Sequence, residues 1–512
     1  MGSRILNIIL KHRMVASLKN MVPMIFAVLG IVMMFLAVLY PYGMNWYGNR
    51  AADRFVALVQ QDQYRQAKLW YYKTCANLPG AMGKDASRYF RQKAEAGLEL
   101  WTGDYLAQQL NKDLLDSRID VLSQIGIKPG NLTKCRNIIY AQELANHYEV
   151  TQAGNIIKAA LQIYPNDPLL VAKQEEYRKQ LEQMVIYRGP IQHIFFHPLI
   201  AYAELAFDQD AMSKGFNDWF VTIREFNLII ESLYKNNYIL VDINDILEKR
   251  TVNGATVLAL RELRLPPGKK PLILSIDDLN YYPYMIQNGT VFKLVLDKQG
   301  NIATYSVNPA QKEIIAYDNE IIPILDEFVR KHPDFSYKGA KGIIALTGYQ
   351  GVLGYRTNDS NSPAYADEEK QARAVIQCLK ATGWSFASHG YGHLDTPKVS
   401  LERLAADTLK WKAEVEPLVG PSEVYIYPFG SRVSPEDARF RYLQQAGFKV
   451  FCAVGSGPYI HFGPEYLLMD RRHIDGISLC TQADLLRDLF NSESIVDYSI
   501  RESTAFYSNC PP

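Results

Sequence analysis

The chain contains 512 residues, which is too long for one small domain and predicts two or three structural units. Its 55 Lys and Arg residues almost balance its 54 Asp and Glu residues, which excludes a general electrostatic attraction to nucleic acid or to anionic lipid. The six cysteines show no CxxC spacing, so neither a zinc knuckle nor a dense disulfide framework is expected.

The N-terminus has the pattern of a membrane anchor. Residues 1–21 form a basic segment, and residues 22–45 contain the 19-residue apolar run from Val22 to Tyr40, which is long enough to cross a bilayer as a helix. The positive flank is expected to stay in the cytoplasm and the chain after residue 45 to lie outside it. No small-residue cleavage pattern ends the run, which favours an uncleaved signal anchor and a single-pass protein of the cell membrane. Aromatic residues typical of the far membrane interface follow the run, namely Tyr40, Tyr42, Trp46 and Tyr47.

Residues 46–186 predict a helical domain. The segment AGNIIKAALQIYPNDPLL at 153–170 carries an apolar stripe at helical spacing and ends in a proline-containing turn. This pattern resembles the second helix of a tetratricopeptide-type repeat, but no 34-residue period recurs, so a generic array of helical hairpins is the alternative. Either arrangement would serve as a spacer or as a docking module for a protein partner.

From residue 187 to residue 490, short apolar segments such as IQHIFFH, PLILSI, KGIIAL and FKVFCAV alternate with helical ones. Strands and helices that alternate in this way predict a parallel β/α barrel, whose chemistry lies at the carboxyl ends of its strands. His197, Asp277 and His389 each follow directly on a predicted strand, so one end of the barrel could gather them. Residues 491–512 are expected to form a C-terminal tail outside this domain.

Two adjacent carboxylates, Asp277 and Asp278, end the strand PLILSI, where their mutual repulsion calls for a proton or a cation. The segment SHGYGH supplies His389 and His393, whose spacing lets both bind one ion. Two imidazoles and one carboxylate leave open positions on zinc or a similar divalent ion. Asp278 would then bind the metal while Asp277 accepts a proton as general base. A solvated turn at the acidic pair and an unrelated histidine pair are the alternatives.

These motifs resemble those of the polysaccharide deacetylase superfamily, the NodB-homology or family-four carbohydrate esterases, over residues 191–487. SIDDL is similar to that family's first motif T-F-D-D-G, SHGYGH to its second motif H-[ST]-x-x-H, and YPFG to its third motif R-x-P-Y. The resemblance implies a distorted (β/α)7 barrel, with Asp277 as catalytic base and Asp278, His389 and His393 as metal ligands. The implied metal is zinc, with nickel or cobalt as alternatives.

The sequence departs from the family pattern at three positions. Leu279 stands where the family usually has Gly, and Gly390 where it has Ser or Thr. Ile426 occupies the place of the third-motif Arg that orients the base. Arg471 or Arg472 could replace that Arg, although either could equally be a surface charge.

The YPFG variant resembles the branch of extracellular poly-N-acetylglucosamine deacetylases, in which the domain is permuted. That resemblance implies that the general acid is His197, from an early strand. His461 and His473, near the C-terminus, are the competing candidates, and His193 is expected in the barrel wall.

The third motif implies a substrate groove, in which a backbone N–H near Phe429 binds the oxyanion. The substrate-binding residues that we predict are Tyr427, Pro428, Phe429, Gly430, Tyr391 and Tyr282. Five tyrosines beside the motifs could stack on sugar faces, although packing in the core is favoured for each one, namely Tyr281, Tyr282, Tyr284, Tyr355 and Tyr391. Residues 288–306 predict a β-hairpin at the rim of the site.

The combined expectation is a membrane-anchored, metal-dependent hydrolase that removes N-acetyl groups from an extracytoplasmic polysaccharide. One alternative is a weak or inactive relative that binds a glycan or a protein partner, which the missing third-motif Arg favours. Another alternative is an O-acetyl esterase on the same fold. No nucleic acid partner is expected.

Overall fold

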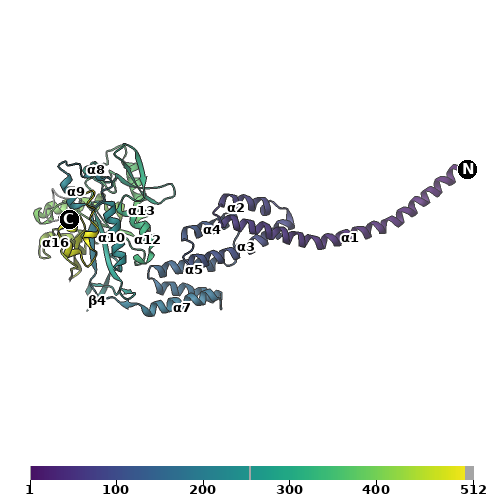
Figure 1. Cartoon of the computed structure of the whole chain (residues 1–512), viewed down its shortest axis with the longest axis horizontal. Coiled ribbons are helices and arrows are strands. Elements are labelled where there is room, and N and C mark those ends of the chain that lie inside the picture. Colours follow the sequence, from purple (N-terminus) through teal and green to yellow (C-terminus); the bar gives the residue numbers. More distant parts are fainter. Residues whose placement is uncertain (1, 253–254, 502–512) are drawn as a thin grey trace. The chain divides into compact units, whose positions relative to one another are not determined.

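The computed structural model describes residues 2–252 and 255–501, which divide into two compact units (Figure 1). One unit contains the chain up to Glu143 together with Ala153–Gln174, and the other contains Leu144–Gln152 together with the chain from Glu175 onward. The boundary therefore passes through the predicted helical domain of residues 46–186, whose last helices contribute to both units.

Helices form the whole chain from residue 2 to Gln183, apart from short connections. Their bounds are α1 Gly2–Gln60, α2 Tyr64–Tyr71, the π-helical turn η1 Tyr72–Ala76, α3 Gly80–Leu106, α4 Lys112–Gln124, α5 Leu132–Asn146, α6 Val150–Ile163 and α7 Pro168–Gln183. The core of the first unit is mainly aliphatic and includes the fully buried rings of Phe55, Phe90 and Trp101. The predicted helical character agrees with these elements, and the tetratricopeptide resemblance stays a prediction.

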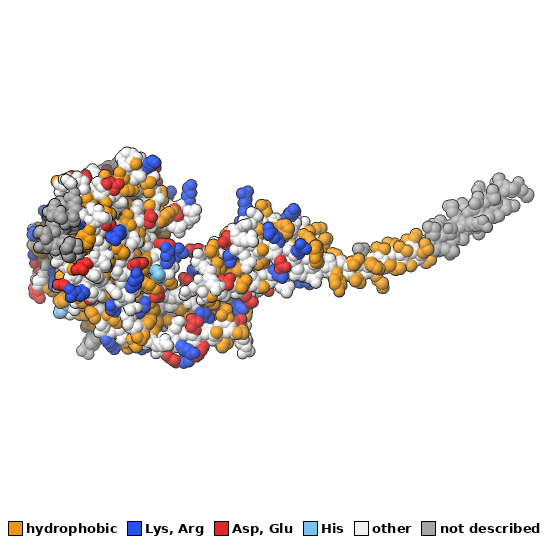
Figure 2. All heavy atoms as spheres, in the orientation of Figure 1, with side chains coloured by type: hydrophobic (Ala, Val, Ile, Leu, Met, Phe, Trp, Pro, Cys, Tyr) orange, Lys and Arg blue, Asp and Glu red, His pale blue; other side chains and the backbone are white. Residues whose placement is uncertain are grey.

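The part of α1 from Pro23 to Gln60 is long and apolar enough to cross a membrane once. The described apolar side chains between Met24 and Leu39 are exposed, which Figure 2 shows as a run of hydrophobic atoms along the helix. Helix α1 also includes residues 2–21 of the predicted basic segment, whose side chains lie outside those that the structure describes.

Helix α3 runs beside α1 in the same direction. The Tyr40 hydroxyl donates to Asp85 Oδ2 at 3.4 Å, and farther along both helices Lys93 pairs with Asp53 at 2.8 Å. Between these contacts the backbone of Gly48 lies against the Tyr89 ring of α3, which leaves no room for a side chain at position 48. Residue numbers therefore rise together along the two helices, so the N-terminus of α3 points back toward the apolar part of α1.

Seven parallel strands close into a barrel in the second unit. In spatial order they are β2 Gln192–Phe196, β7 Lys270–Asp277, β11 Gly342–Leu346, β12 Trp384–Ser388, β13 Val424–Ile426, β14 Val450–Val454 and β16 Tyr466–His473, after which β16 pairs with β2. The predicted parallel β/α barrel is therefore confirmed. Strand β3 Tyr238–Leu240 pairs with the first residues of β7, and β15 Ile460–Gly463 lies antiparallel to β16.

Helices surround the barrel in the order α8 Ala203–Ala206, α9 Ser213–Trp219, α10 Ile223–Lys235, α11 Pro283–Gln287, α12 Ile321–Lys331, α13 Tyr365–Ala381, α14 Leu401–Glu414, α15 Glu416–Val419, α16 Ala438–Gln445, α17 Gly476–Thr481 and α18 Ala483–Leu486. Strand residues are buried on both faces, as parallel sheets require. Along β7, Leu272 and Leu274 pack against the helices, whereas Ile273 packs inside the barrel. The same alternation turns Ser275 and Asp277 inward near the carboxyl end of the strand.

Short antiparallel sheets and 3₁₀ turns complete the unit. Their bounds are β1 Val185–Ile186 with β6 Arg264–Leu265, β4 Leu247–Val252 with β5 Ala255–Leu260, β8 Lys293–Leu296 with β9 Ile302–Val307 and β10 Glu313–Ala316, and η2 Pro333–Phe335, η3 Thr396–Lys398, η4 Pro428–Gly430 and η5 Ser492–Ser494. The hairpin predicted at residues 288–306 is present as β8 and β9, and β10 extends it to three strands.

Residues beyond the expected domain end at residue 490 pack against the barrel unit. Ile495 and Val496 are buried, and Arg501 Nε donates to Glu225 Oε1 of α10 at 2.7 Å. Arg501 compensates the charge of the buried Glu225 carboxylate, which also caps the N-terminus of α10. Residues 502–512 of the expected tail lie outside the described residues.

Glu320 joins the loop after β2 to the start of α12. Its carboxylate accepts hydrogen bonds from the backbone N–H groups of Ile321 at 2.6 Å and Leu199 at 3.2 Å. Burial raises the pKa of Glu320 from 4.5 to about 8, although these N–H groups and the Tyr281 hydroxyl oppose the increase. The folded state therefore holds a proton on Glu320 that the unfolded chain releases at lower pH.

Glu320→Gln is expected to remove this proton linkage. Because the folded pKa is raised, the wild-type free energy of unfolding should fall between pH 4.5 and about 8, by about 1.4 kcal/mol per pH unit relative to the variant. Denaturant unfolding of both proteins across this interval measures the difference. Parallel pH dependences would show that Glu320 is ionised in the folded protein.

Candidate active site

The carboxyl end of β7 separates two adjacent acidic side chains. Asp277 is the last residue of the strand, and Asp278 follows it with a left-handed backbone at φ 58°. The Asp278 N–H donates to the Ala345 carbonyl oxygen at 3.2 Å, which anchors the turn to β11. Asp is one of the few residues that adopt this conformation without a large penalty. Both carboxylates are buried, at 3% and 5% exposure.

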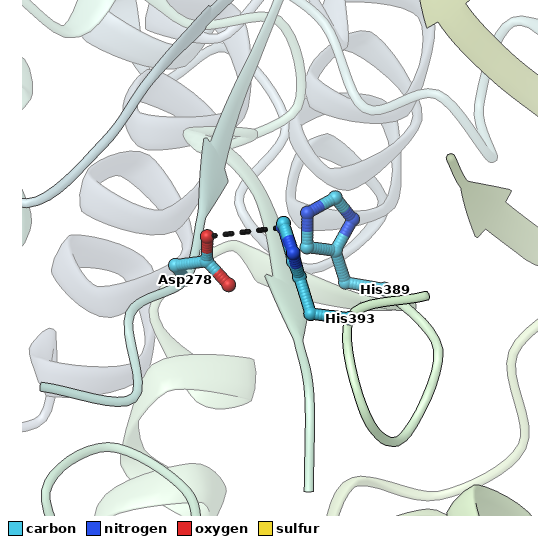
Figure 3. A group of neighbouring side chains, drawn as sticks. All are labelled: Asp278, His389 and His393. Atoms are coloured by element: carbon cyan, nitrogen blue, oxygen red, sulfur yellow. Dashed lines mark ion pairs between the residues drawn. The ribbon is translucent and has the colours of Figure 1, made fainter. Parts of the chain in front are cut away.

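Asp278, His389 and His393 converge at the barrel mouth (Figure 3). Each offers one ligand atom, and these atoms all lie within 4.8 Å of one another. His393 Nε2 is 3.5 Å from Asp278 Oδ2. His389 follows β12 directly, and a short loop returns His393 to the same side, with left-handed backbone at Gly390 and His393. Two imidazoles and one carboxylate could hold a divalent cation with positions left open.

Asp407 of α14 holds the loop between the two histidines. Its two oxygens accept the backbone N–H groups of Tyr391 and Gly392, each at 2.7 Å. Sequence reasoning missed this residue, because a carboxylate in the middle of a helix gives no signal that it binds a distant loop.

The His389 ring is held in one tautomer. Its Nδ1 lies 2.8 Å from the Ile426 carbonyl oxygen, which can only accept, so Nδ1 carries the hydrogen and Nε2 keeps its lone pair. Burial lowers the pKa of His389, although Asp277 and Asp278 oppose this effect. The neutral ring is the form that a metal ligand requires.

Tyr282 and Thr347 fix the Asp278 carboxylate. The Tyr282 hydroxyl donates to Asp278 Oδ1 at 2.7 Å and lies 2.6 Å from Thr347 Oγ1. Burial, followed by the negative charge of Asp278, raises the pKa of Tyr282 well above its ordinary value, so the hydroxyl stays a donor. Asp278 Oδ2 is left to face His393.

Arg471 of β16 binds the other carboxylate. Its Nη1 and Nη2 donate to Asp277 Oδ1 and Oδ2 at 2.7 and 2.9 Å, and its guanidinium lies 4.1 Å from the centre of the Phe195 ring. Burial by itself would raise the pKa of Asp277, but the charge of Arg471, followed by His389 and His197, lowers it to about 2. Asp277 is therefore ionised at neutral pH.

Of the two arginines considered for the missing third-motif position, only Arg471 reaches the acid. Arg472 points to the opposite face of β16, where it binds Asp488 at 2.6 Å and Gln192 at 2.8 Å. Ile426 itself packs in the apolar interior of the barrel. The positive charge in contact with Asp277 therefore comes from β16.

The histidines considered as general acids differ in their contacts. His197 follows β2, and its Nδ1 lies 2.9 Å from the Trp219 carbonyl oxygen. It is close enough to Asp277 to help lower the pKa of that carboxyl. His473 is engaged at both nitrogens, with Asp475 at 2.7 Å and Gln482 at 3.0 Å. His461 is exposed on β15 and stacks beside Tyr459, with ring centres 6.5 Å apart.

His193 lies in the barrel wall, as expected. The residue is buried in β2, and its Nε2 is 3.0 Å from Ser275 Oγ. Burial lowers its pKa well below the ordinary value, with the charge of Arg471 as a further cause.

Three of the residues predicted to bind substrate are buried tyrosines, which fits the packing role considered for such rings. Tyr282, Tyr391 and Tyr427 are 2%, 6% and 0% exposed, so none offers a ring face to a ligand. Tyr282 supports Asp278, and the Tyr391 hydroxyl donates to Glu414 Oε2 at 2.5 Å. Tyr427 packs against Phe451, outside the barrel wall, because successive side chains at the strand end alternate in direction.

Phe429 is the exposed member of the predicted groove. The structure leaves 65% of this residue exposed and puts its ring 4.6 Å, centre to centre, from the ring of His393. Its φ of 59° is left-handed, in the η4 turn whose neighbouring Pro428 is buried and whose Gly430 is half-buried. Trp219, whose carbonyl oxygen contacts His197, is also exposed, at 48%, and no motif or spacing indicated it beforehand.

No family model matches the chain, and no curated protein is similar to it in sequence. Among solved structures, the chain is similar to the Streptococcus pyogenes deacetylase PplD in complex with acetate, at 13% identity and a TM-score of 0.34, over 59% of this chain and 99% of that one. It is also similar to the chitin deacetylase of the fungal pathogen Colletotrichum lindemuthianum, at 11% identity and a TM-score of 0.20, over 34% and 76% of the two chains. These structural neighbours are deacetylases. Similarity at these identities and TM-scores does not establish an activity for this chain.

Arg471→Met is expected to destabilise the protein by about 3–5 kcal/mol, because it leaves the buried Asp277 carboxylate without its partner. Arg471→Lys should cost less, since one charge remains but the two-bond geometry is lost. Arg487→Met removes an exposed pair with Asp484 and should cost less than about 1 kcal/mol. Denaturant unfolding measures all three, and equal stabilities for Arg471→Met and Arg487→Met would contradict the assigned buried pair.

Tyr282→Phe is expected to weaken binding of zinc about 10–100-fold, because the Asp278 carboxylate loses the hydrogen bond to Oδ1 that orients its other oxygen, Oδ2, toward His393. Titration with zinc against a chelating indicator measures this affinity. Tyr284→Phe is the matched control, because Tyr284 stacks on Tyr282 and is 41% exposed. An unchanged affinity in Tyr282→Phe would show that Asp278 does not bind the ion.

Proposed function

We propose that the protein is a metal-dependent hydrolase that removes N-acetyl groups from an extracytoplasmic polysaccharide. The observation that carries this proposal is the arrangement of two neighbouring carboxylates in different environments. Asp278 faces His389 and His393 as one ligand set, whereas Asp277 is held by Arg471 beside that set. Asp278, which is suited to binding a cation, thus lies next to Asp277, an ionised carboxylate that can accept a proton.

The residues present fit a divalent cation, with zinc as the first choice and nickel or cobalt as alternatives. The donor set combines two nitrogens with one carboxylate oxygen, and the hydrogen bonds to Ile426 and Tyr282 orient two of the three ligands. When bound, such an ion polarises an acetyl carbonyl and makes a coordinated water more acidic.

Asp277 is proposed as the general base. Its bidentate contact with Arg471 keeps the carboxylate ionised and fixes its direction, so that it can accept a proton from the attacking water. The alternative of an inactive relative drew on the missing third-motif Arg, and the contact of Arg471 with Asp277 supports the hypothesis of an active enzyme.

His197 is proposed as the general acid for the leaving amine. The Trp219 carbonyl accepts from Nδ1, so Nε2 is the ring nitrogen from which His197 would donate a proton. An amide needs this proton more than an ester does, because an amine leaves poorly as an anion. His197 therefore favours N-deacetylation over O-acetyl ester hydrolysis.

The YPFG turn is proposed to hold the oxyanion and one sugar face. The left-handed backbone at Phe429 lies beside His393, where a backbone N–H can donate to the developing oxyanion. The exposed rings of Phe429 and Trp219 adjoin the ligand set and the proposed acid, and aromatic faces of this kind suit sugar rings.

We further propose that α1 anchors the chain as one membrane span. The apolar, exposed segment that begins at Pro23 supports a span, and the basic residues before it support a cytoplasmic N-terminus. The barrel would then act outside the cytoplasm, and the helical unit would serve as a spacer or as a docking module for a protein partner.

Acetate release from chitooligosaccharides by the full chain tests this function. Release should require zinc and stop with a chelator, and Asp277→Asn should reduce it about 10²–10⁴-fold while zinc content persists. Asp484→Asn, at an exposed carboxylate of α18, is the matched control and should leave the rate unchanged.

Equal rates for Asp277→Asn and the wild type would exclude Asp277 as the base. Bound zinc without release from any acetylated glycan would instead favour a glycan-binding protein. Release from acetyl esters without release from N-acetyl sugars would identify an esterase.

A further inference from the structure

A basic pocket lies at the start of α3 in the helical unit. It has a volume of about 500 Å³ and is formed by η1 and the first turns of α3. Lys84, Arg88 and Arg91 are its charged lining residues, all three are exposed, and the lining includes no carboxylate. The near-zero net charge of the whole chain therefore conceals a local concentration of positive charge.

The contacts between α1 and α3 determine the level of this pocket along α1. Asp85 of α3 lies beside Tyr40, the last residue of the apolar run. Lys84 precedes Asp85, and Arg91 follows it by roughly 9 Å of helical rise. Because the two helices run in the same direction, the backbones of all three residues lie within about 10 Å of the level of Tyr40, measured along the helix axis.

The side chains of α1 at this level are those of a membrane interface. Apolar residues from Met24 to Leu39 are exposed, and next along the helix come exposed Tyr40, Tyr42 and Trp46. With the span in a bilayer, this aromatic band lies among the lipid headgroups. The pocket then opens at the depth of the phosphate groups.

The pocket also combines two kinds of positive potential. Its three cationic side chains come from the second, third and fourth turns of the 27-residue helix α3, and the lining also reaches Gly80 at the N-terminus, where the first backbone N–H groups are free of the helix and the Pro79 N-cap makes no side-chain bond. The nearby acidic side chains have partners outside the pocket, because Asp85 accepts from Tyr40 and Asp53 pairs with Lys93. Asp85 lies 3.8 Å from Arg88, which leaves that cation only weakly paired.

We propose that this pocket binds the phosphate headgroup of an anionic phospholipid in the leaflet beside residues 40–48. The inference rests on the proposed membrane span, because α1 is what brings the pocket to the headgroups. Three Lys or Arg side chains at a membrane surface should favour anionic over zwitterionic headgroups roughly 100-fold. The bound lipid would hold the helical unit against the bilayer.

Hydrogen exchange of the full chain in lipid nanodiscs tests the proposal. With phosphatidylglycerol, backbone amides of residues 78–91 should exchange roughly tenfold more slowly than with phosphatidylcholine alone. Equal exchange in the two lipids would overturn the proposal. A chain that does not enter nanodiscs would instead overturn the span, so the two failures are distinguishable.

The variant Lys84→Glu/Arg88→Glu/Arg91→Glu should lose the effect of phosphatidylglycerol. The matched control is Arg65→Glu/Lys128→Glu/Arg136→Glu, three exposed cations of the same unit that lie farther from the apolar run. Arg88→Lys/Arg91→Lys retains the charge and should retain the effect. Unchanged exchange in the buried part of α4 shows that each variant is folded, and protection that survives the triple reversal would exclude the pocket.

Soluble glycerol phosphate, added to the chain in detergent, distinguishes a lipid from a free anion. No protection of residues 78–91 is expected, because a single soluble phosphate lacks the surface concentration of a bilayer. Protection equal to that in phosphatidylglycerol would show that the pocket takes a soluble phosphate, and would overturn the lipid assignment.

Discussion

Two adjacent carboxylates at the end of β7 constrain the whole site. Asp277 and Asp278 are both buried, and their charges repel unless each has its own positive or proton-donating partner. The left-handed turn at Asp278 directs the two side chains to different neighbours. Arg471 compensates Asp277, whereas Asp278 receives one hydrogen bond from Tyr282 and faces two histidines.

This constraint explains why large side chains near the mouth are buried and polar. Arg471 crosses the barrel interior between Phe195 and Ser275, and Tyr282 extends under Asp278 to Thr347. A buried charge or ligand is oriented best by groups that cannot move, so these residues belong to the scaffold of the site. The aromatic surfaces that a ligand could meet are Trp219 and Phe429, each next to one of the histidines.

The helical unit illustrates a related point about charge. The chain as a whole is almost neutral, yet Lys84, Arg88 and Arg91 lie together because they follow one face of α3. Because α3 runs in the same direction as α1, these three residues lie at the level where the apolar segment of α1 ends. Composition averages over the chain, whereas a membrane or a ligand meets only a local surface.

The sequence by itself determined the features that depend on local order along the chain. Apolar runs predicted the strands, the length of the run after Lys19 predicted a helix able to cross a bilayer, and the motifs at Asp277 and His389 predicted which side chains would meet. Tertiary structure decided what depends on facing neighbours from distant strands and helices. It selected Arg471 over Arg472, buried Tyr282, Tyr391 and Tyr427, and set the direction of α3, because the side of a strand or helix that a residue occupies matters only once a partner packs against it.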